Sequence, residues 1–564
     1  MKHAKHILLM VAMLLCSISV SAEPIEIDGI WYNIVKKVKK AEVARSTAEN
    51  AYTGDIIIPS TVTYDGIECQ VSSIDEYAFY ARNLTSITIP ESVTEIGKYA
   101  FVYCDNLVSV TISNGVTEIK SNTFEGCKSL VSVEIPGSVT IIGEYAFKEC
   151  SALTSISIPE GVTEIEKWAF TECSSLTSIV IPKGVTCIGD HAFSYCHSLA
   201  SVAIPEGVTE IKDGCFAECN LTSVVIPKGV TSIGEQAFLR CSSLLSVAIP
   251  EDVKTIGMAA FGGCSSLTSI SLPESVTSIG GSAFWGCIGL TSIAIPSKVT
   301  RIESLTFENC SSLVSIDIPE GVTSIGWDAF VGCTSLASVV LPESVSSMGA
   351  NSAFYGCSSL VSINIPKKVT FIGKYTFYEC SSLASIEIPE SVTSIGEFAF
   401  YGCSNLANIV LPENLGSVGS KAFANSEMLL DVYCHAEVVP TAQKDAFEGS
   451  LPEYATLHVP ASALESYKRN YPWKNFGNIV ALTDEETGLA TPLSMPIIVK
   501  TNKGEIVLTG LTGGIEVAVY DLAGRGLGTA TAAADGIAAI TTDLATGSTA
   551  IVKIAERTVK VVIK

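Results

Sequence analysis

The chain has 564 residues, of which 47% are hydrophobic and 16% are charged. This balance provides ample apolar surface for a buried core and argues against disorder. The formal net charge is 35 − 58 = −23. Such an acidic chain repels phosphate backbones, and the sequence contains no local basic cluster to offset the repulsion. Nucleic acid is therefore not an expected partner.

Residues 1–22 have the pattern of an export signal: two lysines near the start, an apolar run over residues 7–15, and an A-x-A-like cleavage site that ends at Ala22. The apolar run is too short to span a membrane. Cys16 leaves a lipoprotein anchor open as an alternative, although Leu15 occupies a position where a lipoprotein signal normally has a small residue.

Residues 23–83 are predicted to form an N-terminal cap that ends in a first, degenerate repeat. An opening strand is expected around residues 30–35, and the segment Ile56-Ile57-Ile58-Pro59 already imitates the strand of the later repeats. Arg82 stands where later copies have Cys. An end repeat needs an atypical outer face because nothing stacks on it.

From residue 84 to residue 428 one unit recurs, and the copy at residues 176–198 reads LTSIVIPKGVTCIGDHAFSYCHS. One Phe per copy marks a period of 22, 23 or 24 residues: Phe79, Phe101, Phe124, Phe147, Phe170, Phe193, Phe216, Phe238, Phe261, Phe284, Phe307, Phe330, Phe354, Phe377, Phe400 and Phe423. A fixed period of this length indicates a solenoid, in which each repeat buries its apolar face against its neighbours.

The opening Leu-x-x-Ile-x-Ile-Pro of the unit resembles the strand of a leucine-rich repeat. Its second half, Val-Thr-x-Ile-Gly-x-x-Ala-Phe-x-x-Cys, resembles the BspA-like class of these repeats. The resemblance implies a β-rich solenoid of repeats of about 23 residues, a curved rod with a parallel sheet along one side. It also implies a cell-surface protein, because that class is associated with bacterial surfaces.

Each unit is predicted to contain two strands and a tight turn. In the example, residues 176–181 form the first strand, which Pro182 ends because proline has no amide hydrogen to donate. Residues 185–188 form a second short strand. Gly189 then allows a bend, and a single helical or 3₁₀ turn starting at Ala192 brings the Phe into the core.

Fourteen of the nineteen cysteines follow the repeat Phe by three residues: Cys104, Cys127, Cys150, Cys173, Cys196, Cys219, Cys241, Cys264, Cys287, Cys310, Cys333, Cys357, Cys380 and Cys403. Export would permit disulfides. A site present in every coil, however, favours a column of buried free thiols over pairwise bridges. No CxxC or nearby His set supports a metal site. Cys69, Cys187, Cys215 and Cys434 lie outside the column and are predicted to be core residues.

Strand alternation directs a second column of small residues outward, away from the core. The candidate binding face consists of Ser178, Val180, Ser201, Ser223, Val225, Ser246, Ser269, Ser292, Ser315, Asp317, Ser338, Ser362 and Asn364. These hydroxyl and small apolar groups suit the surface of a protein or a glycan. Alternatively, a crowded curved face simply tolerates small side chains, and the two interpretations stay open.

Aromatic residues gather in the turns around the repeat Phe, among them Tyr145, Trp168, Tyr355, Tyr378 and Tyr401. They vary between copies. They either form an adhesive outer edge or, as is more common, pack against the neighbouring coil.

The repeat pattern breaks after Phe423. Residues 429–482 are predicted to be the closing cap of the solenoid, and residues 483–496 a linker. Residues 497–564 show short alternating strands and Gly-rich turns, which predict a small β-sandwich.

Three stretches of this last segment, residues 517–525, 544–547 and 559–564, resemble the C-terminal sorting domain of type IX secretion cargo. The resemblance implies recognition by secretion machinery. A purely structural sandwich is the alternative.

The six histidines and the many acidic residues form no nucleophile elbow, HExxH motif, phosphate loop or dinucleotide fingerprint. We therefore expect no catalysis, no cofactor and no metal. The sequence predicts a protein secreted to the outer cell surface that binds host or neighbouring-cell proteins or glycoconjugates in an adhesin-like manner. The alternatives are a structural spacer of the envelope and a glycan-capturing accessory protein.

Overall fold

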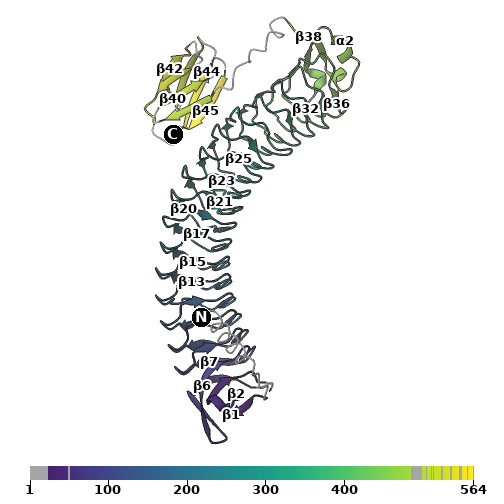
Figure 1. The fold of residues 1–564 in the computed structure, drawn as a ribbon. Coiled ribbons are helices and arrows are strands. Elements are labelled where there is room, and N and C mark those ends of the chain that lie inside the picture. Colours follow the sequence, from purple (N-terminus) through teal and green to yellow (C-terminus); the bar gives the residue numbers. More distant parts are fainter. Residues whose placement is uncertain are drawn as a thin grey trace, which may run out of the picture. The chain divides into compact units, whose positions relative to one another are not determined.

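A computed structural model describes residues 23–46, 48 and 51–483. In the terminal segment it describes residues 498–502, 505–509, 511, 514–521, 525–533, 537–544, 549–554 and 557–562. The predicted signal at residues 1–22 and the predicted linker beyond Thr483 lie outside the described residues. The chain divides into two units, Met1–Ser275 and Val276–Lys564. In each, successive turns of the repeat are stacked one upon the next (Figure 1).

The first unit begins with a largely antiparallel sheet of order β1-β2-β3-β6-β5, which precedes the regular turns. Its elements are β1 (Ile25–Ile27), β2 (Ile30–Val35), η1 (Lys36–Val38), β3 (Lys40–Val43), β5 (Thr61–Tyr64) and β6 (Ile67–Ile74). β6 also pairs with β8 (Glu95–Ile96), and this pairing is parallel, with Ile74 opposite Ile96. This sheet therefore supplies the first rung for the second strand of each repeat.

The first strands of the repeats form parallel sheets in the first unit. Their bounds are β4 (Gly54–Ile57), β7 (Leu84–Thr88), β9 (Ser109–Thr111), β11 (Ser132–Glu134), β14 (Ser178–Val180), β16 (Ser201–Ala203), β18 (Ser223–Val225), β20 (Ser246–Ala248) and β22 (Ser269–Ser271). Equivalent residues pair, for example Ser178 with Ser201 and Val180 with Ala203. Single bridges through Ser157 join β11 to β14. Parallel pairing between equivalent residues is what a constant period produces.

The second strands are two residues long and stack in the same way. In the first unit they are β10 (Glu118–Ile119), β12 (Ile141–Ile142), β13 (Glu164–Ile165), β15 (Cys187–Ile188), β17 (Glu210–Ile211), β19 (Ser232–Ile233) and β21 (Thr255–Ile256). In every one the Ile is buried and the residue before it is partly or fully exposed. The Pro and Gly positions confine pairing to this short stretch.

The segment around each repeat Phe differs from the prediction of a helical or 3₁₀ turn. It consists of linked turns in which the residues two before and two after the Phe have positive φ, such as Tyr99 (φ 59°) and Tyr103 (φ 58°). Left-handed residues at these places interrupt a helix and direct amide hydrogens toward the next coil. The Tyr99 amide donates to the carbonyl of Ser121 over 3.2 Å, and the Phe101 amide to that of Thr123 over 2.9 Å.

Phenylalanine rings fill the interior as a stack. Phe170 is fully buried between Phe147 and Phe193, with ring centroids 5.2 and 5.3 Å away and interplanar angles of 4° and 1°. Neighbouring rings in such a near-parallel stack exclude water along the axis of the coil. The predicted Phe core is confirmed.

The thiol column has a defined partner. The Sγ of Cys196 donates to the carbonyl oxygen of Phe170 in the preceding turn over 3.2 Å, and Cys173 does the same with Phe147. A buried carbonyl that already accepts one amide hydrogen gains a second, weak donor. At the end of the array Ser426 replaces Cys, and its hydroxyl donates to the carbonyl of Phe400 over 3.1 Å. A small hydrogen-bond donor is therefore what this position requires.

The prediction of buried free thiols is confirmed, since the cysteines that the structure describes are all free and the whole column is buried. Burial raises the pKa of Cys196 to about 12. The prediction that Cys187 is a core residue is wrong, because it is only partly buried. Cys187 precedes the buried Ile188 in β15, and strand alternation directs it outward.

The second unit repeats the same architecture. Its first strands are β24 (Ser292–Ala294), β26 (Ser315–Asp317), β28 (Ser338–Val339), β29 (Ser362–Ile363), β31 (Ser385–Glu387), β33 (Asn408–Leu411), β35 (Asp431–Cys434), β37 (Thr456–Val459) and β38 (Asn478–Ala481). Its second strands are β23 (Ser278–Ile279), β25 (Arg301–Ile302), β27 (Ser324–Ile325), β30 (Phe371–Ile372), β32 (Ser394–Ile395), β34 (Ser417–Val418) and β36 (Thr441–Ala442).

The Phe stack continues one turn beyond the boundary at residue 428 that the sequence suggests. Phe447 stacks on Phe423 at 5.2 Å and 11°, and the hydroxyl of Ser450 donates to the Phe423 carbonyl. Strands β35, β37 and β38 extend the same parallel sheet. The short elements η2 (Pro452–Tyr454), α2 (Leu464–Tyr467) and η3 (Trp473–Asn475) follow, and the buried indole of Trp473 donates to the Pro440 carbonyl over 3.0 Å.

The terminal segment contains two small sheets around one apolar core, as predicted for a β-sandwich. One sheet holds β39 (Ile498–Asn502), β40 (Glu505–Thr509) and β43 (Ala538–Thr541), and the other holds β42 (Gly526–Thr531), β41 (Glu516–Asp521), β44 (Thr549–Ile554) and β45 (Arg557–Val562). Ile506, Leu508, Val517, Val519 and Val552 are buried in the shared core. Parts of the sorting-like motifs, at residues 522–524, 545–547 and 563–564, lie outside the described residues.

Candidate binding surfaces

The first strands present their alternate residues to solvent and form what we call the strand face, the outward residues of β14 to β22 in the first unit and their equivalents in the second. Val180 and Val225 are 75% and 77% exposed, which is unusual for valine. Ser178, Ser201, Ser223, Ser246, Ser269, Ser292 and Ser338 are exposed as well. Regular pairing sets the serines side by side in one row.

The remaining candidate residues of the second unit are less uniform. Ser315 and Ser362 are half-buried, and Asp317 is exposed. Asn364 is engaged by the preceding turn: its Nδ2 donates to the Leu341 carbonyl over 2.7 Å, and its Oδ1 accepts from the Leu341 amide over 2.8 Å. This side chain replaces strand pairing at that point and has little capacity left for a ligand. Whether the set binds anything stays a prediction.

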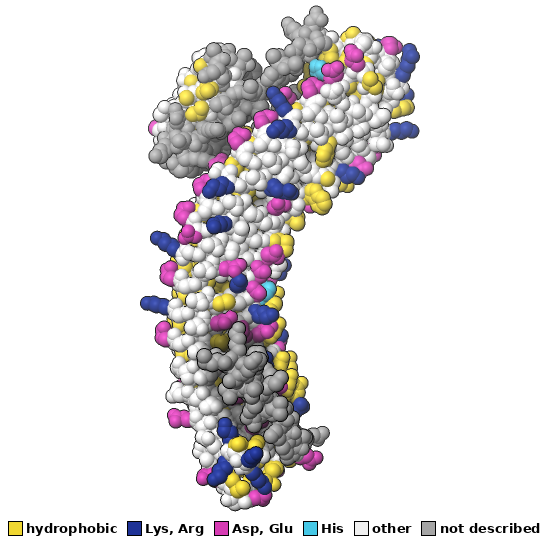
Figure 2. Space-filling view, viewed as in Figure 1, with side chains coloured by type: hydrophobic (Ala, Val, Ile, Leu, Met, Phe, Trp, Pro, Cys, Tyr) yellow, Lys and Arg dark blue, Asp and Glu magenta, His cyan; other side chains and the backbone are white. Residues whose placement is uncertain are grey.

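The strand face of the first unit is almost free of charge. The outward residues of β14 to β22 are serine, valine and alanine only. Charged side chains lie elsewhere on the turns, for example in the ion pairs Lys212–Glu210 and Arg240–Glu218. Figure 2 shows basic and acidic side chains interspersed on the visible face. The acidic side chains that give the chain its net charge of −23 therefore lie outside this stretch of the sheet.

The turn aromatics pack on one another. Tyr355, Tyr378 and Tyr401 are stacked face to face with centroids 4.6 and 4.7 Å apart. Trp168 and His191 are stacked at 4.0 Å, and burial lowers the pKa of His191. Since stacking covers the ring faces, the geometry supports the packing interpretation over an adhesive edge.

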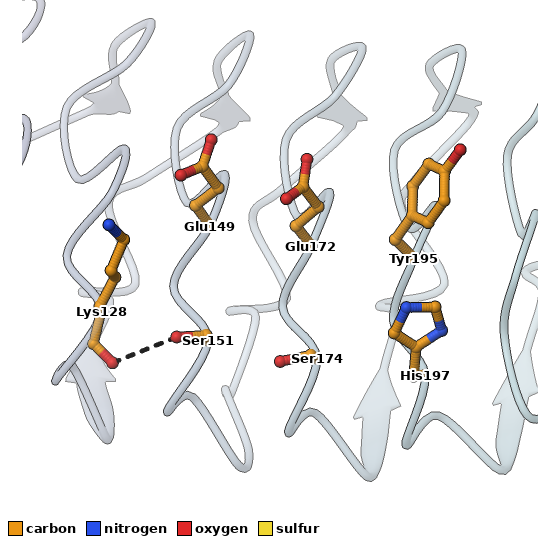
Figure 3. A pocket seen from close by; sticks show the side chains of 7 residues that line it. All are labelled: Lys128, Glu149, Ser151, Glu172, Ser174, Tyr195 and His197. Carbon is orange, nitrogen blue, oxygen red and sulfur yellow. Dashed lines mark hydrogen bonds between the residues drawn. The ribbon is translucent and has the colours of Figure 1, made fainter.

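A shallow groove of about 440 Å³ runs across four turns of the first unit (Figure 3). One of its walls comes from residues two after the repeat Phe and the other from residues that follow the repeat Cys. The lining residues are Lys128, Glu149, Ser151, Glu172, Ser174, Tyr195 and His197. The sequence reasoning missed this groove, although its residues recur at the repeat interval and lining up the turns would have grouped them.

Near the end of the second unit, His458 lies on Tyr433 with centroids 4.3 Å apart, and its Nε2 is 3.0 Å from Asp431 Oδ1. The pairing of β35 with β37 brings these residues together. The neighbouring thiol of Cys434 faces the core, 3.1 Å from the Tyr467 hydroxyl. The His458 side chain on β37 thus contacts two side chains of β35.

Within the part of the chain that the structure describes, no three His, Cys, Asp or Glu side chains are grouped so that they could hold a metal ion. Over the same residues, no helix has the length and apolar character needed to cross a membrane.

The stacked turns, the Phe column and the parallel strands define a leucine-rich-repeat solenoid. The model of the family described as BspA type leucine-rich repeat region (6 copies) matches residues 72–184, 163–257, 240–352 and 328–453. These matches cover more than half of the chain, which therefore belongs to the BspA type leucine-rich repeat family. The predicted family is confirmed.

Among solved structures, the chain is similar to a leucine-rich repeat protein from Bacteroides ovatus, with 29% identity, a TM-score of 0.51 and coverage of 77% of this chain and 99% of that one. A leucine rich cell surface protein from Faecalibacterium prausnitzii is also 29% identical, with a TM-score of 0.33 and coverage of 74% of this chain and 96% of that one. A comparison with curated protein sequences gave no significant match.

Proposed function

We propose that this chain is exported, displayed on the outer cell surface, and binds a protein or glycoconjugate of a host or neighbouring cell through the strand face. The observation that carries the proposal is the exposed, charge-free row of serine and valine side chains on β14 to β22. Membership of the BspA type family supports a surface role. The proposal assigns the chain no catalytic activity.

The chemistry of the face favours burial against a partner. Covering it removes exposed valines from water and requires no ion to be desolvated, whereas most protein surface carries charges whose burial is unfavourable. The outward residues of β14 to β22 include no aromatic or Arg residue, the types that usually act as interface anchors. We therefore expect the partner to contribute the bulky anchors, which this row of small side chains accommodates.

Delivery is assigned to the two ends of the chain. Residues 1–22 carry the chain across the inner membrane, and residues 497–564 mark it for export to the surface by a type IX pathway. The supporting observations are the signal pattern in the sequence and the separate apolar core of the terminal segment. The N-terminal cap then comprises residues 23–83 and the repeat array residues 84–428. The closing cap comprises residues 429–482, and the linker residues 483–496.

The binding proposal is tested by placing charges on the strand face. The variant Val180→Glu/Val225→Glu changes two exposed side chains of two turns, and Thr186→Glu/Thr231→Glu changes exposed side chains of the same two turns outside that face. Binding to immobilised extracellular-matrix proteins and to epithelial cells is compared. We expect the first variant to bind at least about tenfold more weakly, equivalent to about 1.4 kcal/mol, and the second to bind as the unchanged chain does.

Equal binding by both variants would remove the strand face from the proposal and favour the spacer alternative, in which the repeats only provide reach. Delivery is tested separately by deleting residues 497–564. The shortened chain should fold and stay in the periplasm, whereas normal amounts on the surface would show that the terminal segment is only structural.

A further inference from the structure

The groove shown in Figure 3 crosses four successive turns, the last two of which lead into β14 and β16. It has two rows of side chains at equivalent positions in successive turns. Glu149, Glu172 and Tyr195 form one row, and Ser151, Ser174 and His197 form the other. We propose that this groove binds an uncharged glycan chain lying along the stacking direction of the turns.

The spacing of the turns suits such a ligand. Paired parallel strands are about 4.8 Å apart, so each row presents a similar polar group at a short, constant interval. This interval is comparable with the length of one pyranose residue in an extended chain. A repeating site of this kind fits a repeating ligand, because each sugar residue meets a similar set of groups.

Charge argues for a neutral ligand. Glu149 is already paired with Lys148, whose Nζ lies 3.0 Å away, and Lys128 at one end of the groove is 4.0 Å from Asp105. Glu172 is exposed and has no ion-pair partner among the described residues. The groove thus offers carboxylate and hydroxyl oxygens with little excess charge. Such oxygens accept strong hydrogen bonds from sugar hydroxyls, whereas a sulfated or phosphorylated chain would meet Glu172.

Tyr195 supplies an exposed apolar surface in the groove. It is 43% exposed, and its ring contact is edge-on to His197, at 6.0 Å and 81°. Tyr378, by contrast, has a neighbouring ring stacked on each face. A ring face that no described ring covers is available to the C–H side of a sugar. The Nδ1 of His197 lies 3.0 Å from the Glu218 carbonyl oxygen, and this contact helps to hold the imidazole ring in place at this end of the groove.

The proposal does not depend on the strand face, and the two are separable by experiment. Saturation-transfer NMR and titration calorimetry on the full-length chain should detect binding of neutral tetrasaccharides at millimolar concentration. The probes are cellotetraose, chitotetraose and mannotetraose. Tyr195→Ala should weaken the binding by up to about tenfold, the order expected for loss of an aromatic contact. Glu172→Gln should weaken it several-fold by removing the charge from the acceptor.

Tyr103→Ala is the matched control, since Tyr103 is 41% exposed, also follows its repeat Phe by two residues, and lies outside the groove. It should leave tetrasaccharide binding unchanged, and Val180→Glu/Val225→Glu should do so too. Absence of binding to all three tetrasaccharides would overturn the proposal. Equal loss in Tyr103→Ala, or binding of a tetralysine peptide in place of the sugars, would also overturn it.

Discussion

Replacing Phe170 by Ala tests whether the stacked rings hold the coils together pair by pair. Phe170 is fully buried and contacts Phe147 and Phe193 within the stack. Loss of a buried Phe side chain destabilises a protein by about 3–5 kcal/mol. The two stacked contacts place this site in the upper part of that range, because each is worth about 0.5–1.5 kcal/mol beyond area burial.

Hydrogen exchange read by mass spectrometry measures the effect turn by turn. In a solenoid each coil depends on its nearest neighbours. Peptides around Phe147, Phe170 and Phe193 should therefore lose protection first, by up to about three orders of magnitude for about 4 kcal/mol. Peptides of the second unit should change little. The milder variant Phe170→Leu, which keeps most of the volume, should cause a smaller loss over the same peptides.

The pairwise account would be wrong if protection fell by the same amount throughout the described chain. It would also be wrong if Phe170→Ala and Phe170→Leu gave equal losses, because the cavity would then not be the cause.

Three further predictions concern the thiols and the turns. Cys196→Ala should destabilise the fold by about 1–2 kcal/mol through loss of the thiol–carbonyl bond and of packed volume, whereas Cys196→Ser should lose less; denaturant midpoints decide between them, and equal losses would argue against the hydrogen bond. Burial raises the pKa of Cys196 from 9.0 to about 12, so the unfolded thiol ionises first. The stabilisation from this thiol is complete below pH 9 and falls as the pH rises toward 12. Unfolding followed across that range should show a shallower pH dependence for Cys196→Ala, and an unchanged slope would be contrary evidence. Gly214→Ala places a Cβ 2.1 Å from the His191 ring, so the ring should be displaced and the lowered pKa of His191 should return toward its ordinary value by NMR. Gly184→Ala, whose Cβ would meet nothing closer than 3.4 Å, should leave that pKa unchanged.

The interval between Phe residues predicts the fold because every copy repeats the same set of buried positions. One such set is Leu176, Ile179, Ile188, Phe193 and Cys196, and all five are buried. The same regularity predicts free thiols, since a group present in each coil serves that coil. Periodicity does not reveal the acceptor, because the Phe170 carbonyl that receives the Cys196 thiol belongs to another turn.

Features that depend on backbone conformation or on single turns are harder to predict. Tyr99 and Trp168 have positive φ, which bulky residues seldom adopt, so the sequence gives no local sign that these positions interrupt a helix. Asn364 stands at the position that Val180 and Val225 occupy in their turns, yet its side chain bonds Leu341 of the preceding turn. The groove requires Tyr195 and His197 to be considered together with residues of other turns, and one repeat taken alone does not show it.

The central claim is that the uncharged strand face makes contact with a partner. Hydroxyl-radical footprinting of the chain bound to epithelial cells measures this contact directly. Val180 and Val225 on the strands, Leu245 directly before β20, and Met258 on the turns are all exposed in the free chain. The account predicts that binding protects the first three side chains from oxidation and leaves Met258 unchanged. Protection of Met258 with no change at Val180, Val225 and Leu245 would contradict it.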